Sequence, residues 1–174
     1  MKQLTTTRLR LVPLRVEHAE AMFPLLSDPR IDEFIEHEPP VSLECLQERY
    51  RRLETRHSPD GAEQWLNWII QPLEGGACMG FIQATKHTPA TADFAFLLGP
   101  AYWGRGIALE AAGSALHTLF TDYAISSLFA MADKRNVRSI ALLIKLGFQK
   151  VEHAAYPHGA VLPSDHVFQL NRSA

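Results

Sequence analysis

The order of strand-like and helix-like segments along the chain constrains its fold more than any other feature. The middle of the sequence holds three strand-like segments in succession, at 65–72, 77–86 and 92–98. Glu74-Gly75-Gly76 separates the first two, and turn residues between two such runs are typical of a β-hairpin. Strands joined by short turns pair antiparallel. This part of the chain therefore predicts an antiparallel sheet.

Helices and further strands surround this hairpin. The segment "TRLRLVPL" alternates polar and apolar residues and predicts a strand that ends at Pro13. The other expected elements are helices at 17–28, 43–57, 107–123 and 137–146, and strands at 127–132, 148–154 and 166–170. Strands interleaved with helices in this order predict an α/β (α+β) fold, a mixed sheet with helices on both faces.

The composition points to one globular domain over residues 1–174. Apolar residues make up 47 % of the 174, enough to bury a core. There are 17 lysines and arginines against 19 aspartates and glutamates, a formal net charge of −2. This balance argues against a dominant basic face, so nucleic acid is not an expected partner.

The cysteines, the histidines and the lengths of the apolar segments indicate the cellular compartment and whether a metal site is expected. Cys45 and Cys78 are the only cysteines, and their wide spacing fits a reducing cytoplasm. We expect no signal peptide and no membrane contact, because no apolar run follows Lys2 and no segment is long enough to cross a bilayer. The nearest histidine pair, His153 and His158, has no cysteine close by, so we expect no metal site.

The segment "YWGRGIALEA", residues 102–111, carries the clearest chemical signal. Gly104 and Gly106 allow backbone N–H groups to point into a turn that follows a strand and opens a helix. The first N–H groups of a helix lack partners within it and favour an anion. On this tripeptide alone, the interpretation as an ordinary tight turn stays open. A dinucleotide-binding turn does not fit, because Leu109 stands where that motif needs its third glycine.

Two segments together resemble the GNAT superfamily of acyl-CoA-dependent N-acyltransferases. The turn resembles the pyrophosphate loop of this family, written Q/R-x-x-G-x-G/A: Gly106 and Ala108 fill the small positions, and Trp103 stands in place of the usual Gln or Arg. The segment "NVRSIALLIKLGF", 136–148, is similar to the N-x-x-S…K-x-G-F segment of the branch of ribosomal-protein-alanine N-acetyltransferases. The strand order also fits, so the resemblance covers nearly the whole chain.

The resemblance implies a fold and a co-substrate. It implies a mostly antiparallel sheet whose strands at 92–98 and 127–132 splay apart and hold the pantetheine arm of acetyl-CoA. No metal is implied. The residues that it implies as contacts of the co-substrate are Leu97, Leu98, Trp103, Gly104, Arg105, Gly106, Ile107, Ala108, Asn136 and Ser139. Asn136 is also a favoured helix N-cap residue.

The catalytic residues are less well marked. Many members of the family carry a tyrosine where this chain has Leu143, so either Ser139, Tyr156 or water would protonate the departing thiolate, or no acid is needed. Some members place a glutamate near the position of Ala92. Asp93 lies one residue further and would face the other side of the sheet unless a bulge intervenes. Glu36, in the connection that borders the acceptor site of the family, is the other acidic candidate.

These observations predict an enzyme that acetylates a primary amine. We expect the acceptor to be an α-amine of a peptide or small molecule, because no carboxylate base is plainly placed for a more basic amine. A non-catalytic acyl-CoA-binding sensor with a degenerate site stays open as the alternative. We expect the protein to be cytoplasmic, and to be a monomer or a homodimer.

Overall fold

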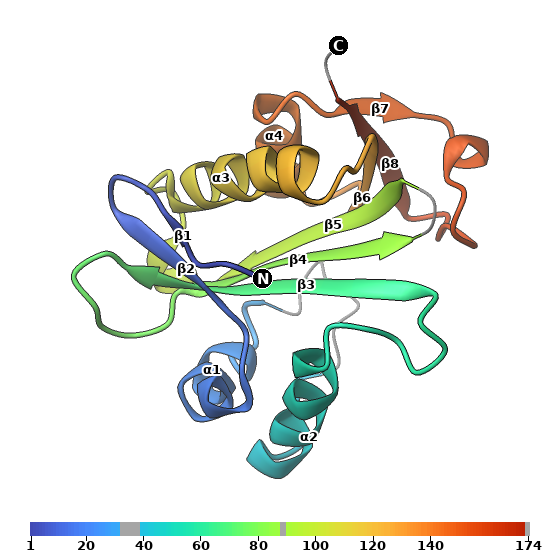
Figure 1. Cartoon of the computed structure of the whole chain (residues 1–174). Helices are drawn as coiled ribbons and strands as arrows, with labels where there is room; N and C mark the ends of the chain where they lie inside the picture. The colour runs from blue at the N-terminus through green and yellow to red at the C-terminus, as the bar shows by residue number, and fades with distance from the viewer. Residues whose placement is uncertain (32–38, 88–89, 173–174) are drawn as a thin grey trace.

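One mixed sheet organises the molecule. The computed structural model describes residues 1–31, 39–87 and 90–172, and within them eight strands form a sheet in the order β1-β2-β3-β4-β5-β6-β8-β7 (Figure 1). The strands are β1 (Leu4–Thr5), β2 (Leu9–Pro13), β3 (Glu63–Pro72), β4 (Gly80–His87), β5 (Thr91–Leu98), β6 (Ser127–Asp133), β7 (Gln149–Val151) and β8 (Asp165–Asn171). The predicted fold class is confirmed.

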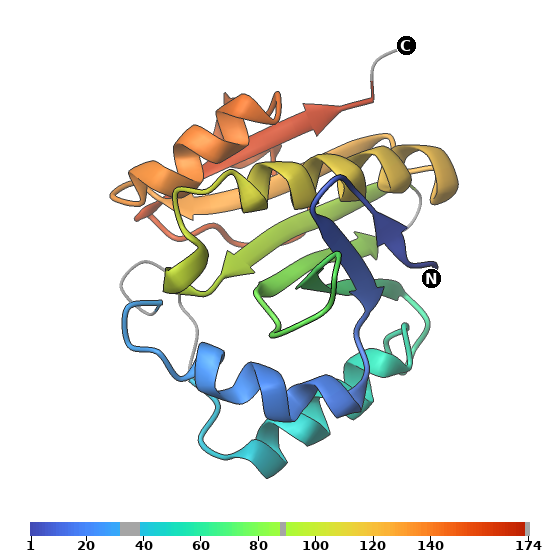
Figure 2. The same ribbon diagram turned by 90° about the vertical axis from the view of Figure 1, so that its left-hand side faces the viewer.

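Helices cover both faces of this sheet. Figure 2 shows α1 and α2 below the sheet and α3 and α4 above it. Their bounds are α1 (Ala19–Leu26), α2 (Leu43–Glu54), α3 (Ile107–Asp122) and α4 (Val137–Lys145). The Ser42 hydroxyl accepts a hydrogen bond from the Cys45 N–H and caps α2, as a serine before an amphipathic run predicts.

The structure departs from the sequence prediction mainly at strand ends. β1 was not expected, because its two residues are too short to show an alternating pattern. The predicted strand at 77–86 begins only at Gly80. The predicted strand at 148–154 is reduced to Gln149–Val151, because the chain turns into a short 3-10 helix at His153–Ala155.

The pairing of β5 with β6 is parallel and short. It joins Thr91 to Ser127, Ala92 to Leu128 and Asp93 to Phe129, and then ends. Beyond Asp93, β5 stays paired with β4 as far as Leu98, while β6 stays paired with β8 as far as Asp133. The two central strands therefore diverge, as the resemblance implied.

Alternation along the strands separates two cores. Ala92 and Phe94 of β5 belong to the core beneath α3 and α4, whereas Leu97 belongs to the core with α1 and α2. β4 pairs with β5 residue by residue from Gly80–Leu98 to His87–Thr91, so no bulge interrupts β5. Asp93 therefore lies on the face that α1 and α2 cover, here called the α1–α2 face.

Cys45 is exposed, Cys78 is buried, and both are free thiols. Among the described residues, no helix is both long enough and apolar enough to pass through a bilayer.

Gly80 allows β4 to approach β5 closely, and this yields a stability prediction. A Cβ atom at Gly80 would lie 2.0 Å from the Leu97 carbonyl oxygen, which is backbone and cannot move aside. We expect Gly80→Ala to lower the free energy of unfolding by about 3 kcal/mol. Gly113→Ala is the matched control, because nothing lies within 4 Å of a Cβ there and the position is helical. It should stabilise by about 0.5–1 kcal/mol. Urea unfolding curves of similar midpoint for both variants would contradict this account.

Candidate active site

The divergence of β5 and β6 leaves two facing strand edges without strand partners. Parallel strands in a sheet normally satisfy each other's N–H and C=O groups. Here the edge of β5 from Phe94 to Leu98 and the edge of β6 from Ala130 to Asp133 do not pair with each other. A buried backbone edge needs hydrogen-bond partners, so this gap is suited to an extended ligand with amide groups.

The turn after β5 presents backbone donors at the end of the gap. Gly106 is the N-cap of α3 with φ at 73°, and Gly104 has φ at 72°, a conformation that favours glycine. Within the described residues, the N–H groups from Gly104 to Leu109 meet no protein acceptor. The amino end of a sixteen-residue helix adds a positive dipole. The turn therefore has the features of an anion-binding site.

A cluster of hydrogen bonds ties this turn to the first strands. Glu110 of α3 accepts from the Thr6 hydroxyl at 2.6 Å and from the Arg8 guanidinium at 2.6 Å, and Arg8 also donates to the Arg105 carbonyl at 3.1 Å. Burial raises the pKa of the Glu110 carboxyl, but the hydrogen bonds from Thr6 and Arg8 outweigh it and hold the pKa below its usual value. The turn is thus fixed by residues far away in sequence.

Trp103 links the turn to α4. Its indole N–H donates to the Leu98 carbonyl at 2.8 Å, and the Arg138 guanidinium lies 5.0 Å from the ring centroid. A cation over an indole face at this distance is attracted to it. Trp103 therefore connects the end of β5 with the first turn of α4, across the mouth of the gap.

The amino end of α4 bears the second sequence motif. The Asn136 side-chain oxygen accepts from the Ser139 N–H at 3.1 Å, which makes Asn136 a helix N-cap. Ser139 is half-buried in the first turn of α4. Leu143, at the position where the family resemblance implied a tyrosine, is 1 % exposed and packs in the core beneath α3 and α4. A hydroxyl is therefore not provided at that position.

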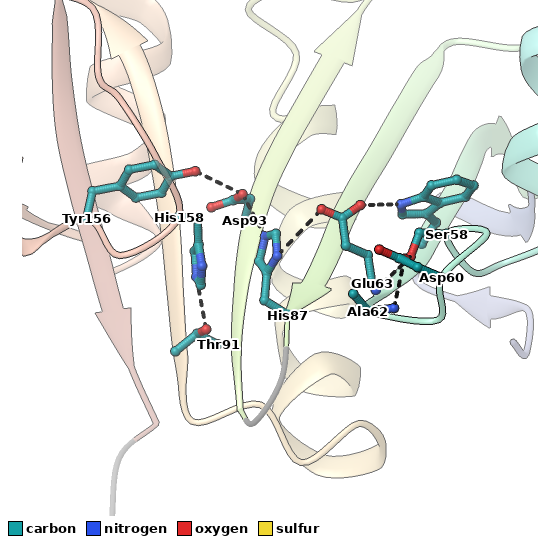
Figure 3. Close-up of polar contacts among 10 residues, drawn as sticks. Ser58, Asp60, Ala62, Glu63, His87, Thr91, Asp93, Tyr156 and His158 are labelled. Carbon is teal, nitrogen blue, oxygen red and sulfur yellow. Dashed lines mark hydrogen bonds and ion pairs between the residues drawn. The ribbon is translucent and has the colours of Figure 1, made fainter.

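A polar cluster surrounds Asp93 at the point where β5 and β6 separate (Figure 3). The Asp93 Oδ2 atom accepts from the Tyr156 hydroxyl at 3.0 Å and lies 3.0 Å from His87 Nε2. Among the described residues, the buried Oδ1 atom has no hydrogen-bond partner. An unpaired buried carboxylate oxygen is costly, and a ligand or water can reach Oδ1 only when the side chains that cover it move.

The histidines of this cluster extend it along the sheet. His87 Nδ1 lies 3.7 Å from Glu63 Oε1, and Glu63 also accepts from the Trp65 indole N–H at 2.9 Å. The ring of His158 stacks on His87 with centroids 3.9 Å apart, and its Nε2 lies 2.9 Å from the Thr91 hydroxyl oxygen. The Phe129 ring packs edge-on against Tyr156 and His158.

Burial shifts the pKa values of two of these groups. Burial raises the pKa of the Tyr156 hydroxyl well above its usual value, and the charge of Asp93 raises it further. Burial lowers the pKa of His158, and the neighbouring His87 lowers it further. Tyr156 therefore keeps its proton at neutral pH, and His158 is neutral there.

His87, Asp93 and His158 also form a group of potential metal ligands. Their nearest ligand atoms lie within 4.8 Å of one another. The two imidazole planes are inclined by only 20°, however. Ring nitrogens bind a metal in the plane of the ring, and two stacked planes do not meet at one ion. The side chains as they lie form hydrogen bonds, and a shared ion would require one ring to turn.

The structure brings together some of the residues predicted from sequence and separates others. Leu97 and Leu98 border the gap, the 104–108 turn lies at its end, and Asn136 and Ser139 begin α4. Asp93 meets Tyr156, but Ser139 belongs to a helix on the opposite face of the sheet. Glu36 lies outside the described residues.

Sequence reasoning missed Glu63, His87 and His158 as members of the cluster. The register of the β3–β4 hairpin pairs Glu63 with His87, and that of β4–β5 pairs His87 with Thr91. A correct register would have brought the first two together from the sequence alone. His158 comes from the irregular connection between β7 and β8, for which the sequence carries no periodic signal.

Comparisons with known proteins agree with this geometry. A family model described as an acetyltransferase (GNAT) domain matches residues 8–149. An uncharacterised N-acetyltransferase of Bacillus licheniformis is 26 % identical over 152 residues, which cover 86 % of this chain and 84 % of the relative.

Two solved structures show the same fold. A ribosomal-protein α-N-acetyltransferase in complex with coenzyme A superimposes with a TM-score of 0.79 at 15 % identity, over 98 % of each chain. A spermidine N-acetyltransferase from Vibrio cholerae, in complex with coenzyme A and spermine, gives a TM-score of 0.74 at 18 % identity, over 94 % of each chain.

Proposed function

The chain belongs to the GNAT acetyltransferase family and uses acetyl-CoA, and on this premise we propose that it acetylates the α-amine of a peptide or of a small molecule. The observation that carries the proposal is the end of β5–β6 pairing at Asp93, with an anion-binding turn at one end of the gap and a polar cluster at the other. We further propose that residues 1–174 form one GNAT domain.

The gap and the turn support a binding mode for acetyl-CoA. The N–H groups from Gly104 to Ala108 would hold the pyrophosphate, because they lack protein acceptors and lie at a helix amino end. The pantetheine amides would pair with the free edge of β5 near Leu97 and Leu98. This directs the thioester toward Asp93, where the strands meet.

Acetyl transfer follows from positioning two reactants in this gap. The neutral amine attacks the thioester carbonyl carbon, a C–N bond forms, and the C–S bond breaks to release the thiolate of coenzyme A. A backbone N–H on the edge of β5 would stabilise the oxyanion. Asp93 Oδ1, which has no partner among the described residues, would accept from an N–H of the acceptor once the side chains that cover it move aside. Tyr156 rather than Ser139 lies beside Asp93, with its hydroxyl bonded to Oδ2.

The acidity of the amine favours an α-amine as acceptor. An α-amino group titrates near pH 8, so roughly a tenth of it is neutral at pH 7, whereas a lysine amine titrating near 10.4 is neutral to well under about one part in a thousand. The lysine amine needs a strong base at close range. Asp93 Oδ2 already accepts from Tyr156 and contacts His87, so this oxygen is not free to take a proton from the amine directly.

The anion-binding turn gives the first prediction on acetyl-CoA. Gly106→Glu places a side chain and a negative charge where the pyrophosphate would bind. The affinity of this variant for acetyl-CoA should be at least about ten-fold lower than that of the wild type. The left-handed backbone makes any side chain here cost about 1–2 kcal/mol of stability. Gly106→Gln is therefore the control of equal size, and it should bind more tightly than Gly106→Glu. Calorimetry that finds wild-type affinity in a folded Gly106→Glu protein would remove the pyrophosphate from this turn.

Asn136 gives a second prediction that separates capping from binding. Asn136→Ala should cost about 1 kcal/mol of stability, because the bond from the Ser139 N–H is lost. If Asn136 also contacts acetyl-CoA, the ligand-induced rise in melting temperature should be smaller than in the wild type. Ser42→Ala is the matched control, because it removes the cap of α2 on the other face. An equal ligand-induced rise in all three proteins would leave Asn136 as a cap alone.

The acceptor is tested with a matched pair of peptides. One has a free N-terminus and a blocked lysine, and the other has a blocked N-terminus and a free lysine. We expect the first to release coenzyme A faster between pH 7 and 9. Faster acetylation of the second peptide would overturn the α-amine assignment. Binding of acetyl-CoA without turnover of any amine, including spermidine, would favour the sensor.

A further inference from the structure

Acetylation of a protonated amine releases a proton that the gap itself cannot remove. An ammonium group and acetyl-CoA give an amide, coenzyme A and one proton. One of the two protons lost by nitrogen restores the thiol, and the other must reach solvent. The inference below rests on the proposed function, since it concerns the route of this second proton.

A row of titratable groups leads away from the point where β5 and β6 separate, with two contacts at hydrogen-bond distance and a third that is longer. Tyr156 donates to Asp93 Oδ2 at 3.0 Å, the same oxygen lies 3.0 Å from His87 Nε2, and His87 Nδ1 lies 3.7 Å from Glu63 Oε1. The His87 side chain is 18 % exposed and the Glu63 side chain 37 %. The row therefore crosses from β5 to β3 (Figure 3). It ends at the Glu63 carboxylate, whose side chain is partly exposed to solvent.

We propose that Tyr156, Asp93, His87 and Glu63 form a proton relay that carries the proton of the acceptor amine to solvent. Both inner contacts fall on one oxygen, Asp93 Oδ2. A proton that arrives from Tyr156 can therefore leave toward His87 once the Oδ2–H bond turns from one contact to the other, with the carboxyl group in place. The second oxygen, Oδ1, takes no part in these two contacts.

Each step of the relay conserves protons and charge. The amine gives a proton to the Tyr156 oxygen as the Tyr156 hydroxyl proton passes to Asp93 Oδ2. Oδ2 passes a proton to His87 Nε2. His87 Nδ1 gives one to Glu63 when a small side-chain movement closes the 3.7 Å separation to hydrogen-bond distance, and water removes it from Glu63. The two ring nitrogens of an imidazole accept and donate on opposite sides, which is why a histidine between two carboxylates can conduct in this way.

The surroundings of His87 hold it in place without adding a competing positive charge. The groups that face it are Glu63 from β3, Asp93 from β5, and His158 from the connection that also carries Tyr156. His158 stacks on it and is neutral at pH 7, and the neighbouring Lys86 bonds instead to the Tyr123 carbonyl at 2.8 Å. His158 is thus a positioning residue.

Kinetics of matched variants test the relay. His87→Gln should lower kcat for the peptide with the free α-amine at least about ten-fold, within the range of general acid–base effects, and leave the KM for acetyl-CoA unchanged. Glu63→Gln should lower kcat less than His87→Gln does, and it should alter the pH profile of kcat. His57→Gln, an exposed histidine near the same end of β3, is the control and should behave as wild type. Imidazole added to His87→Ala should restore turnover, which a structural defect would not allow.

Side-chain NMR tests the same chain of contacts without an acceptor. The ring 15N–1H signals of His87, assigned with His87→Gln, should shift in both Asp93→Asn and Glu63→Gln and stay in place in His57→Gln. Shifts in only one of the two variants, a kcat for His87→Gln equal to that of His57→Gln, or no rescue by imidazole would each overturn the relay. If wild-type protein acetylates no amine, the proposed function fails and the relay fails as a catalytic path, whereas the NMR shifts show whether His87 contacts both carboxylates.

Discussion

The early end of the pairing between β5 and β6 is the constraint on which the rest of the structure depends. Three residue pairs hold the strands together, and after Asp93 each follows a different neighbour. The free edges can be satisfied by an extended ligand with amide groups, and the last pair places Asp93 and Phe129 at the closed end of the gap. The anion-binding turn lies at one end of this gap and the polar cluster at the other, so the gap connects the two.

Because side chains alternate along the strands, the two faces of the sheet carry different kinds of residue. On one face, small and apolar residues such as Ala92 pack beneath α3 and α4, whose amino ends carry the binding motifs. On the other face, Glu63, His87 and Asp93 from three adjacent strands form the polar cluster. We infer that the co-substrate and the acceptor approach from different sides and meet only where the strands part.

The sequence predicts the fold and the binding loop better than the polar cluster. Helix caps such as Asn136 and the glycines of the 104–106 turn act locally, so their conformations can be derived from neighbouring residues. The surroundings of Asp93 depend on strand register and on an irregular connection that brings in Tyr156 and His158 from more than sixty positions away. Alternation did predict that Asp93 faces away from Ala92, and the unbroken register confirms it. The role of that residue remains a prediction.

The position of β8 has a consequence for how the chain acquires its fold during synthesis. β8 lies between β6 and β7, although both precede it in the sequence, and it pairs with each of them. Until residues 165–171 have left the ribosome, the far edge of β6 has no neighbour and β7 has no place in the sheet. The first five strands can assemble earlier, because each pairs with its predecessor. We therefore expect the half that carries β6 and α4 to fold last. In a nascent chain, β5 on one side of the gap is then in place well before β6 on the other.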